Sequence, residues 1–291
     1  MQNRKISGSV AVYANLRIKE KREVALEAVR VLLGCGLKVR LPAFKADLSD
    51  VDLPAEGISF CNKEEMYKDV SLAVVVGGDG TVLDVARCVA GTGVPILGIN
   101  MGRVGYMTEL EPGEIGLIPE IIAGAGRTDV RSMLKLTVNG REPENGTALN
   151  DIVISNSVFS QVIDVSVSEN GSVAGKYRAD GIIFSTATGS TAYNVAAGGP
   201  VIDPRLSCIA VTPICPHTFY SRPTVFPADS ELEVSLAGFR GQSAGILVDG
   251  QPCAKVGKND AVSVTTSEKT VGFIRIKPMK FYQTLHKKNE F

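Results

Sequence analysis

The sequence predicts two domains, an α/β N-terminal domain followed by an all-β, sandwich-like C-terminal domain. In the first half, short apolar runs alternate with stretches whose apolar residues recur at helical spacing, which is typical of a parallel α/β domain. After about residue 131, apolar and polar residues alternate with a period of two, which indicates antiparallel strands. We therefore place the α/β domain at residues 1–130 and the β domain at residues 131–276.

The first half supplies the pieces of a Rossmann-like parallel sheet. Two fully apolar runs, Leu72–Val76 and Pro95–Ile99, are typical of strands buried on both faces. A helical stretch separates the first strand from the second and the third from the fourth, and Gly34 and Gly36 end the first helix. The predicted strands are Ser9–Tyr13, Leu37–Leu41, Leu72–Val76 and Pro95–Ile99, and the predicted helices are Glu20–Leu33 and Val82–Ala90.

In the second half, turn signals separate the alternating stretches. Asn139-Gly140 and Asn170-Gly171 are strong signals for two-residue hairpin turns. One stretch, Ser185–Pro200, is rich in Gly, Thr, Ser and Ala and is too long for a turn, and Met279–Asn289 has weak helical character. The alternating apolar positions are Leu134, Leu136, Val138, Val165, Val167, Leu232, Val234, Leu236, Val262, Val264 and the run Val271–Ile276.

The composition is typical of a soluble globular protein, with 44% hydrophobic and 21% charged residues among 291. Lys and Arg total 31, as do Asp and Glu, so no overall charge favours nucleic acid or an anionic membrane as a partner. The apolar runs are too short to span a bilayer, and the N-terminus lacks the apolar region of a secretory signal. The six dispersed cysteines have no CxxC spacing, which favours reduced thiols over a zinc site or disulfides. We therefore expect a cytoplasmic protein with no metal site made by its own side chains.

A glycine-rich loop, Gly77-Gly78-Asp79-Gly80-Thr81, follows the apolar run Leu72–Val76. Glycines let backbone N–H groups approach a phosphate closely, and the N-terminus of the following helix adds positive partial charge. The loop matches neither a Walker A motif nor a GxGxxG fingerprint. An acid in this place repels a phosphate unless it binds Mg²⁺ or takes a proton from an attacking hydroxyl, so Asp79 is the candidate general base. The structural alternative is a tight turn in which Asp79 caps the next helix.

The loop resembles the GGDGT element of NAD kinases, of diacylglycerol and sphingosine kinases and, more loosely, of phosphofructokinases. This resemblance implies phosphoryl transfer to a hydroxyl but leaves the acceptor open. Further segments are similar to those of the NAD kinase family and follow in the family's order, so that only the N-terminal part of the chain is not covered. These segments are Gly98–Glu109, Asn150-Asp151, Asp180–Tyr193, Ala197–Pro200, Thr212–Thr218 and Asp249–Gln251.

The segment around Tyr193 also suits a dinucleotide on chemical grounds. Tyr193 offers a flat surface for adenine, Asn150 and Asp151 can bind ribose hydroxyls, and Asp180 can accept a hydrogen bond from a carboxamide or hydroxyl. The alternative is an extended polar loop between strands, which does not account for a run of small residues around one aromatic residue. The short hydroxyl groups of the segment are those of Ser185, Thr186, Ser190 and Thr191.

The resemblance to NAD kinases implies a reaction and a set of site residues. The reaction is transfer of the terminal phosphoryl group of ATP, or of polyphosphate, to the adenosine ribose 2′-hydroxyl of NAD, with Mg²⁺ or another divalent cation and with Asp79 as general base. The resemblance further implies a homodimer or homotetramer built through the β domain, and a C-terminal segment, residues 277–291, that returns to the first domain. The expected substrate contacts are Gly77, Gly78, Gly80, Thr81, Tyr106, Asn150, Asp151, Arg178, Asp180, Ser185, Thr188, Ser190, Thr191, Ala192, Tyr193, Ala196 and Gln251.

Two other functions stay open at the level of sequence. One is another GGDGT-loop kinase with a lipid or sugar hydroxyl as acceptor, and the other is a non-catalytic dinucleotide sensor. Residues 178–200 and the Asn150-Asp151 pair argue against the first, and the intact Asp79 loop argues against the second. The sequence departs from the family pattern at Ala187, which stands where the family has Pro, at Asn194 and Ala196, which replace common serines, at Tyr106, which stands where the family has Phe, and at Gln161, where some relatives carry His.

Overall fold

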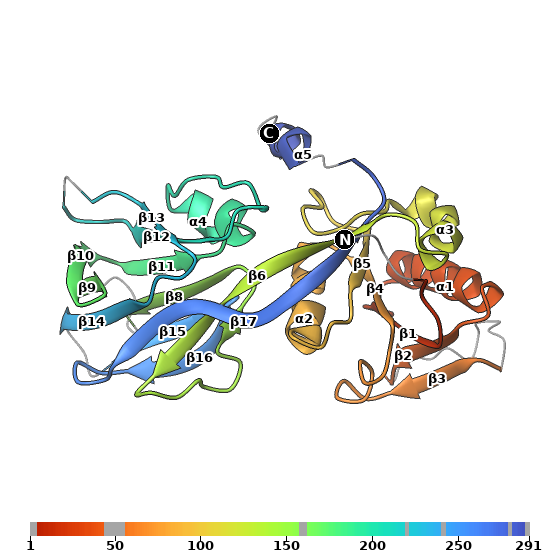
Figure 1. Cartoon of the computed structure of the whole chain (residues 1–291), viewed down its shortest axis with the longest axis horizontal. Helices are drawn as coiled ribbons and strands as arrows, with labels where there is room; N and C mark the ends of the chain where they lie inside the picture. Colours follow the sequence, from red (N-terminus) through yellow and green to blue (C-terminus); the bar gives the residue numbers. More distant parts are fainter. Residues whose placement is uncertain are drawn as a thin grey trace. The chain divides into compact units, whose positions relative to one another are not determined.

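The computed structural model describes residues 5–43, 56–156, 162–218, 221–239, 243–278 and 281–288. The chain divides into two compact units (Figure 1). Unit 1 consists of Met1–Val130 together with Val271–Phe291, and unit 2 consists of Arg131–Thr270.

Unit 1 is built on a parallel sheet in the order β5-β4-β1-β2-β3, and the C-terminal end of β17 lies next to β5. In the register of this sheet Val10 pairs with Leu72, and Val39 pairs with Ile58. The strands are β1 (Ser9–Ala14), β2 (Lys38–Pro42), β3 (Ile58–Cys61), β4 (Leu72–Gly77) and β5 (Ile96–Asn100). The helices are α1 (Lys19–Gly34), α2 (Asp79–Val89), η1 (Pro112–Leu117), α3 (Ile118–Ile122) and α5 (Phe281–Lys288).

Helices cover both faces of this sheet, because its central strands carry apolar side chains on both sides. Helices α1 and α3 pack on the face formed by Val10, Val12, Val74 and Val76. Helix α2 follows β4 directly and lies on the other face (Figure 1). Since β4 and β5 are neighbouring parallel strands, the loops that follow them meet at one edge of the sheet, where ligands of α/β proteins bind.

Unit 2 is a sandwich of antiparallel sheets. One sheet has the order β13-β12-β11-β8-β15-β16, and the other layer contains β10-β9-β14-β17, with β6 pairing both β17 and β7. A single buried cluster includes Phe184 and Ile246 from the first layer and Val165 and Leu232 from the second. The elements are β6 (Arg127–Val138), β7 (Thr147–Ala148), β8 (Asp151–Asn156), β9 (Ile163–Glu169), β10 (Ser172–Ala179), β11 (Gly181–Ser185), η2 (Gly189–Thr191), α4 (Tyr193–Ala196), β12 (Cys208–Ile214), β13 (Thr224–Pro227), β14 (Leu232–Phe239), β15 (Ala244–Val248), β16 (Gln251–Val256) and β17 (Val262–Arg275).

The predicted fold class, a parallel α/β sheet and an antiparallel β sandwich, is confirmed. The Asn-Gly signals form tight turns with two residues in the left-handed region. Asn139 and Gly140 have φ angles of 51° and 74°, and Asn170 and Gly171 have φ angles of 50° and 75°. These angles are those of type I′ hairpin turns, which match the twist of the flanking strands.

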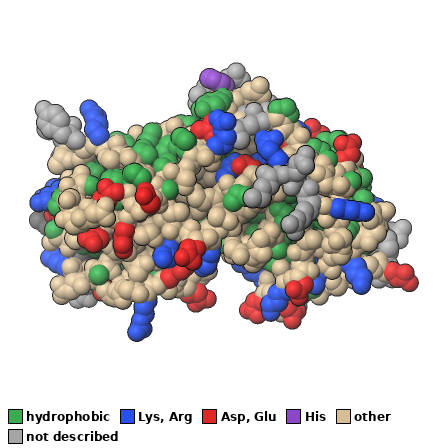
Figure 2. Space-filling model, in the orientation of Figure 1, with side chains coloured by type: hydrophobic (Ala, Val, Ile, Leu, Met, Phe, Trp, Pro, Cys, Tyr) green, Lys and Arg blue, Asp and Glu red, His purple; other side chains and the backbone are tan. Residues whose placement is uncertain are grey.

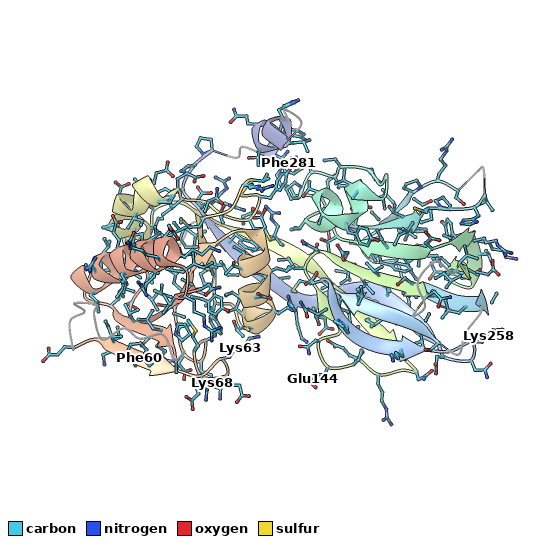
Figure 3. The ribbon with its side chains drawn as sticks, turned by 180° about the vertical axis from the view of Figure 1, so that it is seen from behind. Phe60, Lys63, Lys68, Glu144, Lys258 and Phe281 are labelled. Atoms are coloured by element: carbon cyan, nitrogen blue, oxygen red, sulfur yellow. The ribbon has the colours of Figure 1, made fainter. Side chains whose placement is uncertain are left out.

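Near the C-terminus, two stretches that read as separate strands form one strand. Strand β17 has 14 residues, although the polar run Thr265–Thr270 interrupts the alternation of its apolar residues. Val264 pairs with β14 of unit 2, whereas Phe273 pairs with β5 of unit 1. Helix α5 begins at Phe281 (Figure 3), while the ends of its predicted range, Met279 and Asn289, lie outside the described residues.

Basic and acidic side chains are interspersed on the face of the molecule drawn in Figure 2. This distribution agrees with the equal totals of 31 basic and 31 acidic residues. Of the helices that the structure describes, none is both long and apolar enough to cross a membrane.

Candidate functional site

The glycine loop lies at the carboxyl end of β4. Strand β4 ends at Gly77, Gly78 is the N-cap, and α2 begins at Asp79. A Cβ atom on Gly77 would lie 2.5 Å from the Oγ1 of Thr81, and one on Gly102 would lie 2.9 Å from the Cα of Gly78. The loop therefore packs backbone against backbone on the segment that follows β5. The first N–H groups of a helix have no helical acceptor and carry positive partial charge, so the loop offers a place for an anion.

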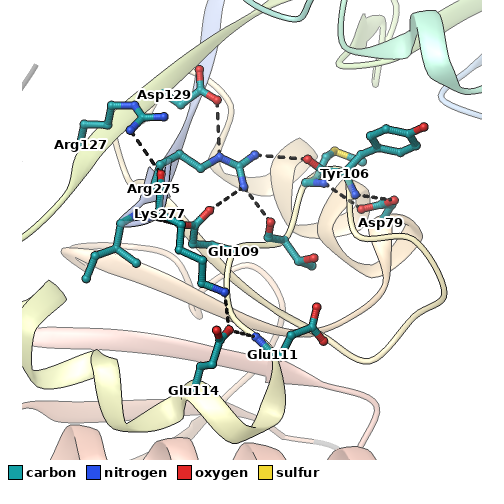
Figure 4. Close-up of polar contacts among 12 residues, drawn as sticks. Asp79, Tyr106, Glu109, Glu111, Glu114, Arg127, Asp129, Arg275 and Lys277 are labelled. Atoms are coloured by element: carbon teal, nitrogen blue, oxygen red, sulfur yellow. Dashed lines mark hydrogen bonds and ion pairs between the residues drawn. The ribbon is translucent and has the colours of Figure 1, made fainter. Parts of the chain in front are cut away.

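The Asp79 carboxylate is held by the backbone of that same neighbouring segment. Its Oδ2 accepts the N–H of Tyr106 at 3.2 Å, and its Oδ1 accepts the N–H of Met107 at 2.9 Å (Figure 4). Both oxygens thus bind N–H groups from outside α2, and Gly78 rather than Asp79 occupies the N-cap position. The alternative in which Asp79 serves only to cap α2 does not describe this structure.

The segment after β5 is shaped to present these two N–H groups. The Asn100 side chain accepts the N–H of Gly102 at 3.0 Å and donates to Glu111 at 3.2 Å. Gly105 has a φ angle of 75°, and a Cβ atom there would lie 2.7 Å from the Oγ1 of Thr108. A residue without a side chain is therefore required where the chain turns, and the next two N–H groups point at the Asp79 carboxylate.

Tyr106 stands where the family has Phe. Its ring centroid lies 6.2 Å from that of Phe281 at the start of α5. Burial, and secondly the charge of Asp79, raise the pKa of the Tyr106 hydroxyl above its ordinary value. The phenol therefore stays protonated at neutral pH and does not compete with Asp79 as a base.

In unit 2, Asp249 organises the Asn150-Asp151 pair. Its Oδ2 accepts the N–H of Leu149 at 3.0 Å, and its Oδ1 accepts those of Asn150 at 2.8 Å and Asp151 at 3.2 Å. Asp249 is only 6% exposed. Sequence reasoning selected Gln251 from this turn and missed Asp249. The order of the residues along the chain gives no sign that this carboxylate meets the 149–151 backbone.

The loop after β11 packs tightly on the same pair. A Cβ atom on Gly189 would lie 2.1 Å from the carbonyl oxygen of Asn150. The hydroxyl of Thr186 donates to the carbonyl of Leu149 at 2.6 Å and accepts the N–H of Gly189 at 2.9 Å. Close backbone contact and one buried hydroxyl thus fix the loop against residues 149–151.

Ser185 is the last residue of β11 and Ser190 lies in the loop that follows it, and both are 0% exposed. Ser185 donates to the carbonyl of Thr186 at 3.0 Å. Ser190 donates to the carbonyl of Ala187 at 2.7 Å and accepts the N–H of Ile202 at 3.0 Å. Both side chains are predicted nucleotide contacts, whereas in this structure their hydroxyls bind the backbone and give the loop its shape.

Asn194, which replaces a serine of the family pattern, is also fully buried. Its amide nitrogen donates to the carbonyls of Ser190 at 3.1 Å and Pro200 at 2.9 Å, and its oxygen accepts the hydroxyl of Thr212 at 2.7 Å. A serine has a single hydroxyl hydrogen and cannot donate to both carbonyls. The Asn194 side chain therefore makes more hydrogen bonds here than a serine could, and it serves to fix this loop.

Arg178 and Asp180 lie at the opposite end of β11 from Ser185. The strand spans five residues, which separates its ends by roughly 13 Å. The Arg178 side chain is 60% exposed and lies 4.0 Å from Asp164, and Asp180 lies 3.9 Å from His217. The structure therefore does not bring these two residues together with the Asn150-Asp151 pair.

The predicted contact residues thus fall into separate groups. The glycine loop and Tyr106 belong to unit 1, and Arg178 with Asp180 forms a separate group in unit 2. The remaining residues are the Asn150-Asp151 pair itself, members of the segment that runs from Ser185 at the end of β11 to Ala196 at the end of α4, and Gln251 at the start of β16. Thr191 is buried, Thr188 and Ala192 are half-buried, and Tyr193, Ala196 and Gln251 are exposed.

Two polar groups of the Asn150-Asp151 pair suit a ligand. The Oδ1 of Asn150 is buried and has no hydrogen-bond partner among the described residues. Asp151 is 5% exposed, and burial, followed by the carboxylate of Asp249, raises its pKa to about 7. Since buried polar groups are nearly always paired, these groups mark a place where a hydroxyl or N–H of a ligand can bind.

Comparison with known protein families identifies both halves of the chain. The ATP-NAD kinase N-terminal domain matches residues 58–124, and the ATP-NAD kinase C-terminal domain matches residues 149–276. The chain is 37% identical over 283 residues to the NAD kinase of Moorella thermoacetica, covering 96% of this chain and 88% of that protein. It is 39% identical over 282 residues to the NAD kinase of Symbiobacterium thermophilum, covering 94% and 97% of the two chains.

Solved structures of similar fold include a yeast NADH kinase complexed with NADH and an NAD kinase from Archaeoglobus fulgidus in complex with ATP. The yeast structure has a TM-score of 0.87 at 20% identity, covering 99% of this chain and 89% of that one. The Archaeoglobus structure has a TM-score of 0.70 at 25% identity, covering 97% and 98% of the two chains. The first likeness supports the fold alone.

The raised pKa of Asp151 predicts a pH dependence of stability. Below about pH 4 the carboxyl is protonated in both the folded and the unfolded chain, so it contributes no penalty. Between pH 4 and 7 the unfolded chain ionises first, so the free energy of unfolding falls as the pH rises, by at most about 4 kcal/mol in total at roughly 1.4 kcal/mol per pKa unit. Asp151→Asn removes this loss. In urea unfolding at pH 5 to 8, the free energy of unfolding of the variant should therefore increase relative to that of the natural protein as the pH rises.

The matched control is Glu231→Gln, a charge-neutralising change at an exposed position of unit 2. Its stability should follow that of the natural protein at each pH. If the free energies of unfolding of Asp151→Asn and of the natural protein changed with pH in parallel, the pKa of the Asp151 carboxyl would not be raised in the folded chain.

Proposed function

The chain belongs to the ATP-NAD kinase family of phosphotransferases, and from this membership and the geometry of the glycine loop we propose the reaction that it performs. It transfers the terminal phosphoryl group of ATP to the adenosine ribose 2′-hydroxyl of NAD, giving NADP. The observation that carries this proposal is a carboxylate fixed beside a phosphate-binding loop by two backbone N–H groups.

The geometry of Asp79 suits a general base. Each carboxylate oxygen can accept two hydrogen bonds, and each oxygen here accepts one backbone N–H. An acceptor site is therefore left on each oxygen for the hydroxyl of the substrate. As the hydroxyl attacks the phosphorus, Asp79 takes its proton, and the bond from the terminal phosphorus to the bridging oxygen of the donor breaks.

The glycine loop supplies the phosphate site. The residues fit this role because Gly77 and Gly78 bring the backbone close, Gly80 is exposed with open space where a Cβ would lie, and α2 begins at this point. Mg²⁺, bound to the phosphates of the donor, supplies neutralising charge. Among the residues that the structure describes, no group of three His, Cys, Asp or Glu side chains could hold a metal ion, so we propose that the cation enters with the triphosphate.

The residues near the Asn150-Asp151 pair recognise the dinucleotide in this proposal. The unpaired Oδ1 of Asn150 and the carboxyl of Asp151 accept hydrogen bonds from the substrate, and the exposed ring of Tyr193 stacks on a base. Arg178 and Asp180, being exposed, bind another part of the dinucleotide. The further contacts that we propose are Thr188, Thr191, Ala192, Ala196 and Gln251.

We also propose a homo-oligomeric enzyme of the cytoplasm. All six cysteines are free thiols, as expected in a reducing compartment. Val173 on β10 and Val225 on β13 are 57% and 48% exposed, and each strand lies at an edge of its sheet. Exposed apolar side chains at sheet edges suit contacts between copies of unit 2.

A donor-by-acceptor activity matrix on the purified protein tests the proposed function. ATP and polyphosphate are the donors, and NAD, NADH, diacylglycerol, sphingosine and fructose 6-phosphate are the acceptors. NADP formation from NAD and ATP that stops on removal of divalent cations is the expected result. Turnover of a lipid or sugar alone points to another GGDGT-loop kinase, and NAD binding without turnover points to a sensor.

Asp79→Asn is expected to lower turnover by roughly 10²–10⁴-fold, the usual contribution of a side-chain base. The affinity for NAD, measured by calorimetry, should change less than turnover, because the amide keeps one oxygen that can accept a backbone N–H and loses the contact at the other position. Asp84→Asn is the control, since it makes the same change in the same helix at a side chain that is 51% exposed. Near-full turnover of Asp79→Asn would refute the assignment of the base.

Gly189→Ala is expected to weaken NAD binding, because its Cβ would lie 2.1 Å from the backbone of Asn150. Overpacking typically costs about 1–3 kcal/mol of folding stability. We expect the shift of Asn150 that relieves the contact to lower NAD affinity by roughly 5- to 150-fold, the factor that the same free energy gives in a binding equilibrium. Gly245→Ala is the control, since a Cβ there meets nothing within 4 Å. Equal NAD affinities of the two variants would show that the Gly189 contact does not shape the binding site.

A further inference from the structure

Arg275, at the C-terminal end of β17, is a buried cation that the proposed mechanism does not use. It is 9% exposed. Its guanidinium donates to the carbonyl of Thr108 at 2.7 Å and to the carbonyl of Tyr106 at 3.3 Å (Figure 4). It also forms ion pairs with Glu109 at 3.3 Å and Asp129 at 3.5 Å.

Glu109 makes the reciprocal contact, from segment 106–109 to the end of β17. Its Oε1 accepts the N–H of Ile276 at 2.9 Å and that of Lys277 at 2.7 Å. The side chain of Arg275 thus binds the backbone of residues 106–108, and the side chain of Glu109 binds the backbone that follows Arg275. These reciprocal hydrogen bonds fix segment 106–109 on the end of β17.

One peptide group links Arg275 to the candidate base. The carbonyl of Tyr106 accepts a hydrogen bond from Arg275, and the N–H of Met107, on the other side of the same peptide group, donates to Asp79 at 2.9 Å. A trans peptide is planar and its C=O and N–H point in opposite directions, and the described residues contain no cis peptide bond. A hydrogen bond at the carbonyl therefore sets the direction of the N–H.

The positive charge of Arg275 also acts on the strength of this contact. A cation at the carbonyl oxygen polarises the peptide group, so that its N–H becomes a stronger donor. The two effects have the same consequence, because both strengthen the hydrogen bond that holds the Asp79 carboxylate in one direction. A base that is displaced by about 1 Å can lose roughly 10²-fold in rate.

We propose that Arg275 is a positioning residue for Asp79, acting through the peptide group between Tyr106 and Met107. The inference rests on the proposed function, since it assumes that Asp79 is the base. Lysine does not substitute for arginine in this role. A single ammonium lacks the planar fork that reaches two carbonyls and a carboxylate together.

Arg275→Lys tests the proposal by its kinetic signature. We expect kcat to fall roughly 10- to 100-fold, with the KM values for NAD and ATP changed less than twofold. In the Asp79→Asn background the same change should have almost no further effect on kcat, because the base that it positions is absent. An equal loss in both backgrounds would show that Arg275 supports only the fold, and an unchanged kcat in the natural background would also overturn the proposal.

Lys277→Met is the matched control, because Lys277 lies two residues further on and its side chain pairs with Glu114 instead of segment 106–109. Its kcat should stay within twofold of that of the natural protein. If Arg275→Lys does not melt cooperatively, the pair Arg275→Met with Glu109→Gln takes its place, since it leaves the net charge of the buried cluster unchanged. This double variant is then expected to lower kcat in the natural background and to have almost no further effect on kcat in the Asp79→Asn background. Full turnover of Asp79→Asn by itself would refute the proposed base, and is distinguishable from a failure at Arg275 alone.

Discussion

Two N–H groups of a neighbouring segment hold the Asp79 carboxylate. The role of the glycine loop as a phosphate site with a base beside it depends on this pair of hydrogen bonds. An aspartate at the start of a helix commonly accepts N–H groups of its own first turn. Those N–H groups are also the donors that a bound phosphate needs. Because Tyr106 and Met107 hold the carboxylate instead, the first turn of α2 stays available for an anion while an acid is fixed beside it.

Unit 2 uses a carboxylate in a related way. Asp249 accepts three consecutive backbone N–H groups and thereby fixes the turn that carries Asn150 and Asp151. In unit 1 the backbone orients a carboxylate, whereas in unit 2 a carboxylate orients the backbone. Both arrangements place polar groups at the ends of rigid strands, which holds them more accurately than a free loop would.

The sequence predicted β1, β2, β4 and β5 of unit 1, the helices α1 and α2 and the place of the glycine loop, because apolar spacing and glycines are local signals. It did not indicate β3 or α3. It did not reveal Asp249 or Arg275, whose hydrogen-bond partners lie 99 and 167 residues away. Asp249 binds three backbone N–H groups and Arg275 binds two backbone carbonyls. Every residue carries such groups, so residue type gives no sign of these contacts. The same reason explains why Ser185 and Ser190 were predicted to contact a nucleotide. The sequence shows that each carries a hydroxyl, but not whether that hydroxyl faces a ligand or the backbone.

Residues 271–291 complete unit 1, although residues 131–270 come between them and the rest of that unit. A ribosome adds about 5–20 residues per second and releases the chain from its N-terminus onward. The glycine loop is therefore made well before Arg275, and unit 1 stays unfinished while the whole of unit 2 emerges. Nascent chains that stop before β17 therefore carry the glycine loop without the hydrogen bonds that Arg275 and Glu109 make between segment 106–109 and the end of β17.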